Sequence, residues 1–234
     1  MITKEKLQYS AHPLPDRMEF SDAQSMAEVA AFRARMVKRH SVRDFSVRPV
    51  PRPVIELAIA TAGSAPSGAN HQPWFFAAVS DPTLKSRIRT EAEREEEAFY
   101  AGGGGDEWIR ALEPIGTTAS KPHLDIAPWL IVVFAQRYGV FEDGTRYKNY
   151  YVSESVGIAT GFLIAALHHA GLVTLTHTPN PMKFLNGALG RPDHEKPVMI
   201  LACGHASEDA TVPAAAKIKK PLDEIAAFYE APSI

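Results

Sequence analysis

The sequence is poor in the residues that build cross-links and metal centres. Its 234 residues include a single cysteine, Cys203, so one chain cannot form an internal disulfide or a cysteine-ligated zinc or iron–sulfur site. Nine histidines are scattered without the spacing of a metal-binding motif such as H-E-x-x-H. We therefore predict no metal site. Cys203 ends the apolar run 197–203, and we expect it to be a buried core residue.

Long apolar runs and an excess of one charge are also missing. The longest apolar stretch, residues 156–167, is too short to span a bilayer, and the N-terminal M-I-T-K-E-K lacks the apolar region of a signal peptide. The formal net charge is −2, without the basic bias that is typical of nucleic-acid-binding proteins. These absences predict a cytoplasmic protein that binds neither membrane nor nucleic acid.

Helix and strand patterns follow one another along the chain and predict one α+β domain with a central sheet. Residues 1–20 are expected to form an extended arm, and residues 21–234 a single domain. Helices are expected over residues 21–38, 54–62, 82–100, 150–170 and 181–189, strands over 74–79, 129–135, 172–176 and 198–203, and a short helix with an arm after residue 221. The helix over 150–170 is apolar on most faces, which one small sheet cannot cover, and this favours a partner subunit.

A cationic cluster lies where the first helix gives way to a loop. Arg39, His40, Ser41 and Arg43 place cations and a hydroxyl within five residues, and the arginine fork matches the geometry of a phosphate. Taken alone, this cluster is more typical of a solvated helix end, where cations favour the helix dipole. A phosphate site therefore needs support from other parts of the chain.

Three later segments give that support, although each has a simpler interpretation. Residues 65–70 are small, so a planar ring could approach their backbone closely, but they could also be only a turn. Hydroxyl groups follow one another at the end of the strand over 172–176, where threonine is also common for its β propensity. The lysines of residues 217–220 add cations or form a solvated charge run.

A second candidate site begins on the acidic helix that ends near Tyr100. Glu96 and Tyr100 are four residues apart and therefore share one helical face, and Lys121 follows a glycine-rich segment, residues 102–105, that we expect to be mobile. A free amino acid needs an anion for its ammonium, a cation for its carboxylate and a group that excludes water. Glu96, Lys121 and Tyr100 supply these three functions, while the other glutamates of the helix are typical of a solvated face.

In order and spacing, the segments of the chain resemble the nitroreductase superfamily of FMN proteins and, within it, the iodotyrosine deiodinase family. The resemblance covers about residues 35–228. It rests on Arg39-His-Ser-Val-Arg43, residues 61–69 with Gln72-Pro-Trp74, the Glu-rich helix ending in Tyr100, Asp125-Ile-Ala-Pro128, residues 165–174, Thr178-Pro179, residues 189–196, and residues 210–213 with 220–222. It implies a nitroreductase-like α+β fold, with a central mixed sheet flanked by helices, in an intertwined homodimer.

The resemblance also implies a role for each candidate residue. Arg39, His40, Ser41 and Arg43 would hold the phosphate and ribityl end of FMN, together with Lys219; His40 and Lys219 stand where arginines are usual. Pro66, Ser67 and Gly68 would line the flavin ring from the other subunit, and Thr176, His177 and Thr178 would lie along it, with the catalytic Thr178 hydroxyl at N5. Glu96, Tyr100 and Lys121 would form a lid over the substrate, and the Ala69 amide would hold its phenolate oxygen.

The implied activity is FMN-dependent reductive dehalogenation of a halotyrosine (iodo, bromo or chloro), which gives tyrosine and halide. An NAD(P)H-linked reductase, a ferredoxin or a flavodoxin would supply the electrons. Two alternatives stay open from the sequence. One is a general FMN-dependent NAD(P)H nitroreductase or quinone reductase, which would be indifferent to substitutions at Glu96, Tyr100 and Lys121. The other is a flavin-binding or flavin-destructase-like protein, which would bind no amino acid tightly.

Overall fold

The computed structural model describes residues 9–231. The expected N-terminal arm lies partly outside this range, and its described part, residues 9–20, is exposed and has no regular secondary structure. Helix α1 (Asp22–Met36) has Ser21 as its N-cap residue. The Ser21 hydroxyl accepts from the Gln24 backbone N–H, and the Gln24 side chain accepts from the Ser21 N–H, and together these bonds form a capping box.

A four-stranded sheet forms the centre of the protein, in the order β1 (Trp74–Val79), β2 (Trp129–Gln136), β6 (Glu195–Gly204) and β5 (Val173–His177). Neighbouring strands pair antiparallel. Ser41 adds a parallel bridge to Thr174 of β5, so the sheet has the mixed character that we expected. This bridge ties the segment after α1 to the edge of the sheet.

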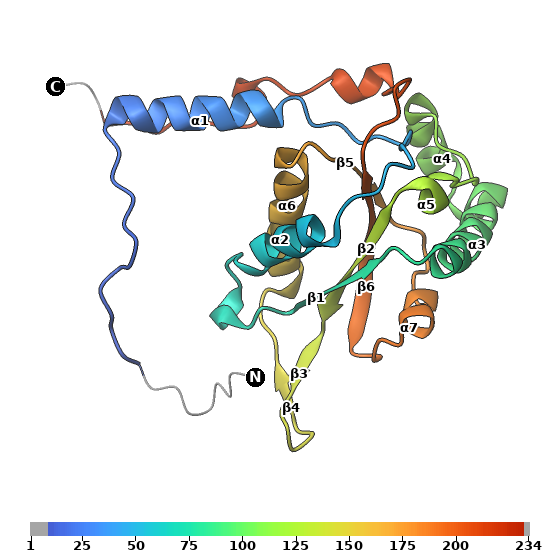
Figure 1. Cartoon of the computed structure of the whole chain (residues 1–234), viewed down its shortest axis with the longest axis horizontal. Helices are drawn as coiled ribbons and strands as arrows, with labels where there is room; N and C mark the ends of the chain where they lie inside the picture. The colour runs from blue at the N-terminus through green and yellow to red at the C-terminus, as the bar shows by residue number, and fades with distance from the viewer. Residues whose placement is uncertain (1–8, 232–234) are drawn as a thin grey trace.

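Helices cover both faces of the sheet (Figure 1). One face carries α2 (Arg52–Gly63) and α6 (Val152–His169), and the other carries α3 (Pro82–Ala98), α5 (His123–Ile126) and α7 (Phe184–Leu189). Side chains of a strand alternate between faces, so Leu130 and Val132 of β2 join the α3 core while Ile131 joins the α2 and α6 core. Cys203 is a buried core residue as predicted, and burial raises the pKa of its thiol to about 12.

Several local elements differ from the sequence prediction. The acidic helix leaves the α conformation after Ala98 and continues as a π turn, η3 (Phe99–Gly103), followed by α4 (Asp106–Leu112) and the short turn η4 (Glu113–Ile115). A hairpin of β3 (Tyr138–Val140) and β4 (Arg146–Lys148) projects from the body. Short turns also occur as η2 (Gly68–Asn70), η5 (Ala214–Lys217) and η6 (Leu222–Glu224), the last being all that forms of the expected C-terminal helix within residues 9–231.

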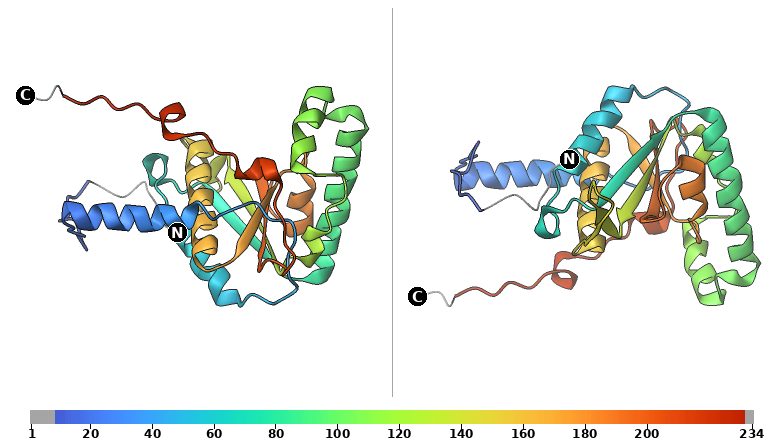
Figure 2. Two further views of the ribbon diagram at one scale, coloured as in Figure 1. Left: turned by 90° about the horizontal axis from the view of Figure 1, so that it is seen from above. Right: turned by 90° about the horizontal axis from the view of Figure 1, so that it is seen from below.

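Two arms extend from the side of the body that carries α2 and α6. Helix α1 and the segment after residue 218 both project there in every view (Figures 1 and 2). No residue of α1 is buried, although it presents large apolar side chains such as Met26, Val29 and Phe32. Across residues 9–231, no helix combines the length and the apolar character that a bilayer crossing requires.

Candidate active site

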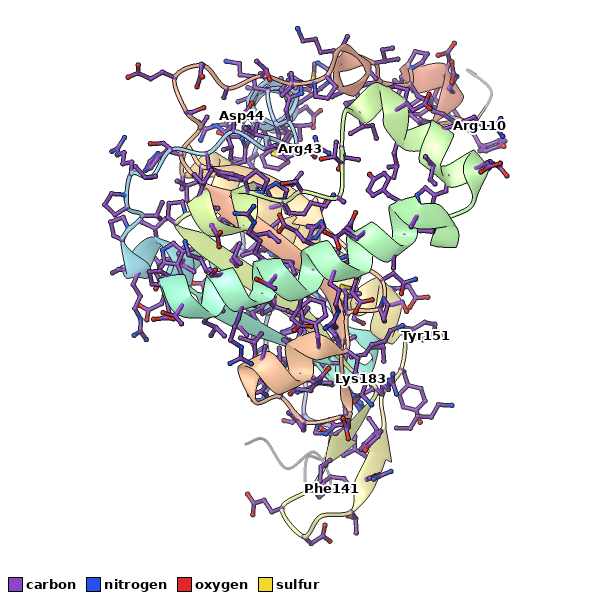
Figure 3. The ribbon with its side chains drawn as sticks, turned by 90° about the vertical axis from the view of Figure 1, so that its right-hand side faces the viewer. Arg43, Asp44, Arg110, Phe141, Tyr151 and Lys183 are labelled. Atoms are coloured by element: carbon purple, nitrogen blue, oxygen red, sulfur yellow. The ribbon has the colours of Figure 1, made fainter. Side chains whose placement is uncertain are left out.

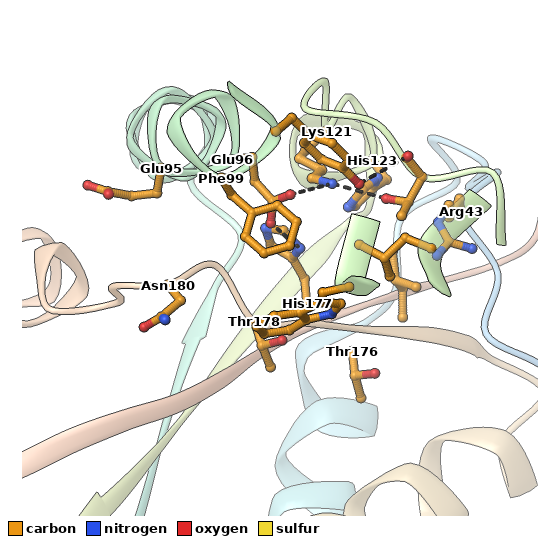
Figure 4. A pocket seen from close by; sticks show the side chains of 15 residues that line it. Arg43, Glu95, Glu96, Phe99, Lys121, His123, Thr176, His177, Thr178 and Asn180 are labelled. Carbon is orange, nitrogen blue, oxygen red and sulfur yellow. Dashed lines mark hydrogen bonds and ion pairs between the residues drawn. The ribbon is translucent and has the colours of Figure 1, made fainter. Parts of the chain in front are cut away.

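A pocket opens between the end of β5, the C-terminal end of α3 with its π turn, and the segment that leads into α5 (Figure 4). Its wall is polar beneath α3 and aromatic toward α4. The lining residues are Arg43, Glu95, Glu96, Phe99, Tyr100, Trp108, Leu112, Thr117, Lys121, His123, Leu175, Thr176, His177, Thr178 and Asn180. The pocket therefore contains Glu96, Tyr100 and Lys121 together with both threonines, Thr176 and Thr178, that we expected to lie along a flavin.

Glu96 and Lys121 form an ion pair inside this pocket. Lys121 Nζ lies 3.0 Å from Glu96 Oε2, and the two side chains are only 4% and 14% exposed. The Lys121 ammonium also donates to Thr117 Oγ1, at 3.1 Å, and to the Thr118 carbonyl. These three acceptors match its three protons, so the buried cation is fully satisfied within one chain.

Tyr100 completes the group that the sequence predicts. Its hydroxyl donates to the Thr117 carbonyl at 3.0 Å, and its ring centroid lies 5.8 Å from Lys121 Nζ. Phe99 packs edge-on against Trp108 of α4, with ring centroids 5.0 Å apart, which holds α4 over the turn. The glycine-rich segment thus connects two aromatic side chains that form one wall of the pocket.

Two histidines lie beneath the ion pair. His177 Nδ1 is 4.0 Å from Glu96 Oε1, and the rings of His177 and His123 meet edge to face at 5.8 Å. Burial, reinforced by the nearby Lys121 charge, lowers the pKa of His177 to about 3 and that of His123 to about 4. Both rings are therefore neutral at pH 7. His123 is not among the site residues that the sequence predicts, and its position two residues after Lys121 is the only signal for it.

The last two residues of β5 and the residue that follows it alternate in exposure. His177 is buried toward α3, while Thr176 and Thr178 are exposed. Alternation along an extended chain produces this arrangement, because successive side chains point to opposite faces. The two threonine hydroxyls are thus available to a ligand, while the imidazole of His177 belongs to the wall beneath Glu96.

The cationic segment runs beside β5. The Val42 N–H donates to the Thr174 carbonyl at 3.1 Å, which places Ser41 and Arg43 next to the strand that carries the threonines. Arg43 is half-buried and lines the pocket; burial lowers its pKa, and the nearby Tyr100 and Asp44 oppose that shift. Asp44 accepts hydrogen bonds from the backbone and hydroxyl of Thr211 (Figure 3 shows Arg43 and Asp44 at this end of the sheet).

Several polar groups of this segment have no protein partner. Among residues 9–231, the guanidinium groups of Arg39 and Arg43 make no hydrogen bond or ion pair, and the buried Nδ1 of His40 has none either. Arginine side chains that form no hydrogen bond or ion pair with the protein fit an anionic ligand such as a phosphate. Lys219 lies exposed after η5, and its place beside that phosphate stays a prediction.

The small-residue loop lies on the other side of the protein. Pro66, Ser67, Gly68 and Ala69 follow α2, far from α3 and α4 in Figures 1 and 2, and none of them lines the pocket. The loop is tightly built: a Cβ added to Gly68 would sit 2.6 Å from the Tyr150 carbonyl oxygen, and Ser67 Oγ accepts from the Gln72 N–H. One chain therefore does not bring this loop to the other predicted site residues.

Comparison with known proteins places these observations in a family. The model of the nitroreductase family matches residues 36–205. The iodotyrosine deiodinase of Haliscomenobacter hydrossis is 51% identical over 195 residues, which are 83% of this chain and 88% of that protein. Human iodotyrosine deiodinase 1 is 42% identical over 222 residues, 94% of this chain and 74% of that protein.

Solved structures agree with this assignment. A crystal structure of oxidized iodotyrosine deiodinase bound to FMN and 3-iodo-L-tyrosine superimposes with a TM-score of 0.69 at 30% identity, over 86% of this chain and 99% of that one. A BluB-like flavoprotein from Clostridium difficile 630 shares the fold at 21% identity, with a TM-score of 0.61.

Proposed function

The chain belongs to the nitroreductase family, and we propose that it is an FMN-dependent reductive dehalogenase that converts a halotyrosine, such as 3-iodotyrosine, to tyrosine and halide. The observation that carries this proposal is the meeting of Glu96, Tyr100 and Lys121 in one pocket beside Thr176 and Thr178. A general nitroreductase has no need of a buried anion and a buried cation at the mouth of its site. A zwitterionic amino acid needs both.

The chain fits an FMN cofactor at the edge of this pocket. Arg39, Arg43 and the buried Nδ1 of His40 are groups without protein partners and would hold the phosphate with Ser41 and Lys219. The exposed hydroxyls of Thr176 and Thr178 would lie along the ring. FMN would supply the electrons, since side chains cannot, and the protein would supply orientation and exclusion of water.

A homodimer would bring the remaining residues to the cofactor. Pro66, Ser67, Gly68 and the Ala69 amide, which we assign to the flavin ring and the phenolate oxygen, lie too far from the pocket of their own chain. The face made by α2 and α6 is apolar and open: Leu57 is 70% exposed, and Ile158 and Phe162 are about two-fifths exposed. A second copy that covers this face would place its loop at the first copy's pocket.

The ion pair suggests how the substrate enters. Glu96 and Lys121 neutralise each other in the free chain, which avoids two unpaired buried charges. A halotyrosine would replace this single pair with two, its ammonium on Glu96 and its carboxylate on Lys121. Tyr100, Phe99 and Trp108 would cover the bound amino acid and exclude water from it. The protein electron donor and the cytoplasmic location stay predictions.

The test is anaerobic turnover by the FMN-loaded protein reduced with dithionite. We expect stoichiometric iodide and tyrosine from 3-iodotyrosine, and much slower iodide release from 2-iodophenol. Rapid oxidation of NADPH by nitroaromatics or quinones, without iodide release, would instead support a general nitroreductase and overturn the proposal.

A further inference from the structure

Five side chains on one face of α3 and its π turn contact a single segment of the chain, residues 117–127. They are Lys85, Arg89, Glu93, Glu96 and Tyr100, hereafter the α3 row. Their spacing of four, four, three and four residues keeps them on one side of the helix. Their partners occur in the reverse order, from Ala127 at one end to Thr117 at the other, so the segment runs past the helix in the opposite direction.

The first half of the row fastens α5 to the helix. Lys85 Nζ is buried and donates to the carbonyls of Asp125, at 2.8 Å, and Ala127, at 2.7 Å. Arg89 donates to Asp125 Oδ2 and to Glu93 Oε1, both at 2.8 Å. None of these contacts involves the pocket, so they fix the segment in place whatever the pocket contains.

Glu93 stands at the boundary between the two halves of the row. Its Oε1 accepts the backbone N–H of Lys121 at 2.6 Å, and it also lies 3.5 Å from the Ser120 hydroxyl. Burial opposes its ionisation, but the hydrogen bond from Lys121 and the charge and hydrogen bond of Arg89 outweigh burial, so the pKa of Glu93 lies below its usual value. The side chain is therefore a carboxylate that Arg89 orients toward the Lys121 backbone.

Lys121 is thus held by α3 at both of its ends, by Glu93 at the backbone and by Glu96 at the ammonium. The two contacts differ in one respect. Under the proposed function, the Glu96 contact would change when a zwitterion binds, because the substrate ammonium would compete with Lys121 for the Glu96 carboxylate. The Glu93 contact lies on the main chain and does not have to change.

We propose that Glu93 is a positioning residue for halotyrosine recognition: it holds the Lys121 backbone so that the Lys121 ammonium stays in reach of the substrate carboxylate when Glu96 exchanges Lys121 for the substrate ammonium. This inference rests on the proposed function. It assigns Glu93 no contact with substrate or flavin. It also separates Glu93 from Lys85, whose contacts fasten α5 alone, while Arg89 contacts both α5 and Glu93.

The test compares Glu93→Ala with Glu93→Gln in the FMN-loaded protein. The glutamine side chain keeps an acceptor for the Lys121 N–H, whereas alanine removes it. We expect Glu93→Ala to raise KM for 3-iodotyrosine by about tenfold, with kcat within about twofold, and to leave the dissociation constant of 2-iodophenol unchanged. Glu93→Gln should restore most of the loss. Glu97→Ala, on the exposed side of the same helix, is the matched control and should behave like the wild type.

Three outcomes decide the inference. An unchanged KM in Glu93→Ala, with an active wild type, would overturn the role of Glu93 while leaving the proposed function intact. Equal losses for iodotyrosine and iodophenol, with a lower melting temperature or loss of flavin, would make Glu93 a structural residue and also overturn it. A wild-type protein that neither binds nor dehalogenates iodotyrosine would refute the proposed function itself.

Discussion

The pocket beneath α3 and the face made by α2 and α6 differ in how far one chain completes them. In the pocket, the Lys121 ammonium has three partners and the Glu96 carboxylate has a cation, all from the same chain. On the opposite face, Leu57 and Phe162 lie open to solvent, and α1 buries no residue at all. We therefore propose that recognition of the two charged groups of the amino acid is built within one protomer, whereas the flavin site draws on residues of two.

The candidate residues divide in the same way. Arg43, Thr176, Thr178 and the ion pair surround one pocket, while the loop at residues 66–69 lies across the molecule. Substitutions in the two regions should therefore have different effects on the assembly, on cofactor binding and on ligand binding. Substitutions on the open face should abolish the assembly and the cofactor together. Substitutions in the pocket should change the choice of ligand and leave the assembly alone.

The largest effect is expected on the open face, from the double variant Leu57→Asp and Phe162→Asp. Covering two large apolar side chains contributes about 3–6 kcal/mol, so charges there should weaken self-association by about 100-fold or more. Sedimentation velocity should show a flavin-containing dimer for the wild type and a monomer without flavin for the variant. Val47→Asp, at a residue that is 82% exposed in a loop, is the control. If the variant remained a dimer with bound flavin, the dimer interface would have to lie on another face of the protein.

In the pocket, the variant Lys121→Met tests whether ligand binding can be changed without a change in the dimer. The variant removes the cation for the substrate carboxylate and leaves the Glu96 carboxylate without its partner, while the thioether chain fills similar space. We expect the affinity for 3-iodotyrosine to fall by about 100-fold and the affinity for 2-iodophenol to change by less than about threefold. Isothermal titration calorimetry measures both. Loss of the dimer in this variant would contradict the claim that the pocket and the face made by α2 and α6 have separate roles.

The two buried histidines predict a smaller effect, on stability as a function of pH. Their pKa values in the folded protein, about 3 for His177 and about 4 for His123, lie below the usual value near 6.5, so the unfolded chain takes up protons first as the pH falls. Stability is therefore unaffected above pH 6.5 and declines toward pH 4, by up to about 1.4 kcal/mol per pH unit for each histidine.

Urea unfolding between pH 7 and pH 5 measures this decline. His177→Gln should make the slope of stability against pH shallower, and His12→Gln in the exposed N-terminal segment should leave it unchanged. An identical slope for the wild type and His177→Gln would show that His177 is not held neutral in the pocket.

The elements that sequence patterns predict well are those whose signals are local. The apolar run of β2 identifies a strand buried on both faces, and the spacing of Glu96 and Tyr100 places both side chains on one face of α3. The hairpin of β3 and β4 escaped prediction because strands of three residues are too short for alternation to be recognised. The π turn escaped because it depends on the backbone conformation at the start of the glycine-rich segment, where Gly102 has a φ of 121° that side-chain spacing does not reveal.

In the candidate site, too, the features with local sequence signals were predicted and those that depend on long-range packing were not. The residue types for a zwitterion are visible in the sequence, but the direct contact between Glu96 and Lys121 is a long-range contact that no spacing encodes. The burial of His123 and His177 depends on how α3 and α5 close over the end of β5, and Glu93 resembles every other glutamate of an acidic helix. The sequence therefore predicted several residues that line the pocket, and the structure shows how their side chains are held.

The most direct test of the account is a titration of the oxidised, FMN-loaded protein followed by flavin fluorescence, with 3-iodotyrosine and 2-iodophenol as ligands and Glu96→Gln beside the wild type. We expect the wild type to bind 3-iodotyrosine far more tightly than 2-iodophenol. Glu96→Gln should lose about 100-fold in affinity for the amino acid and little for the phenol. Equal losses for both ligands, or equal affinities in the wild type, would contradict the claim that this pocket recognises a zwitterion.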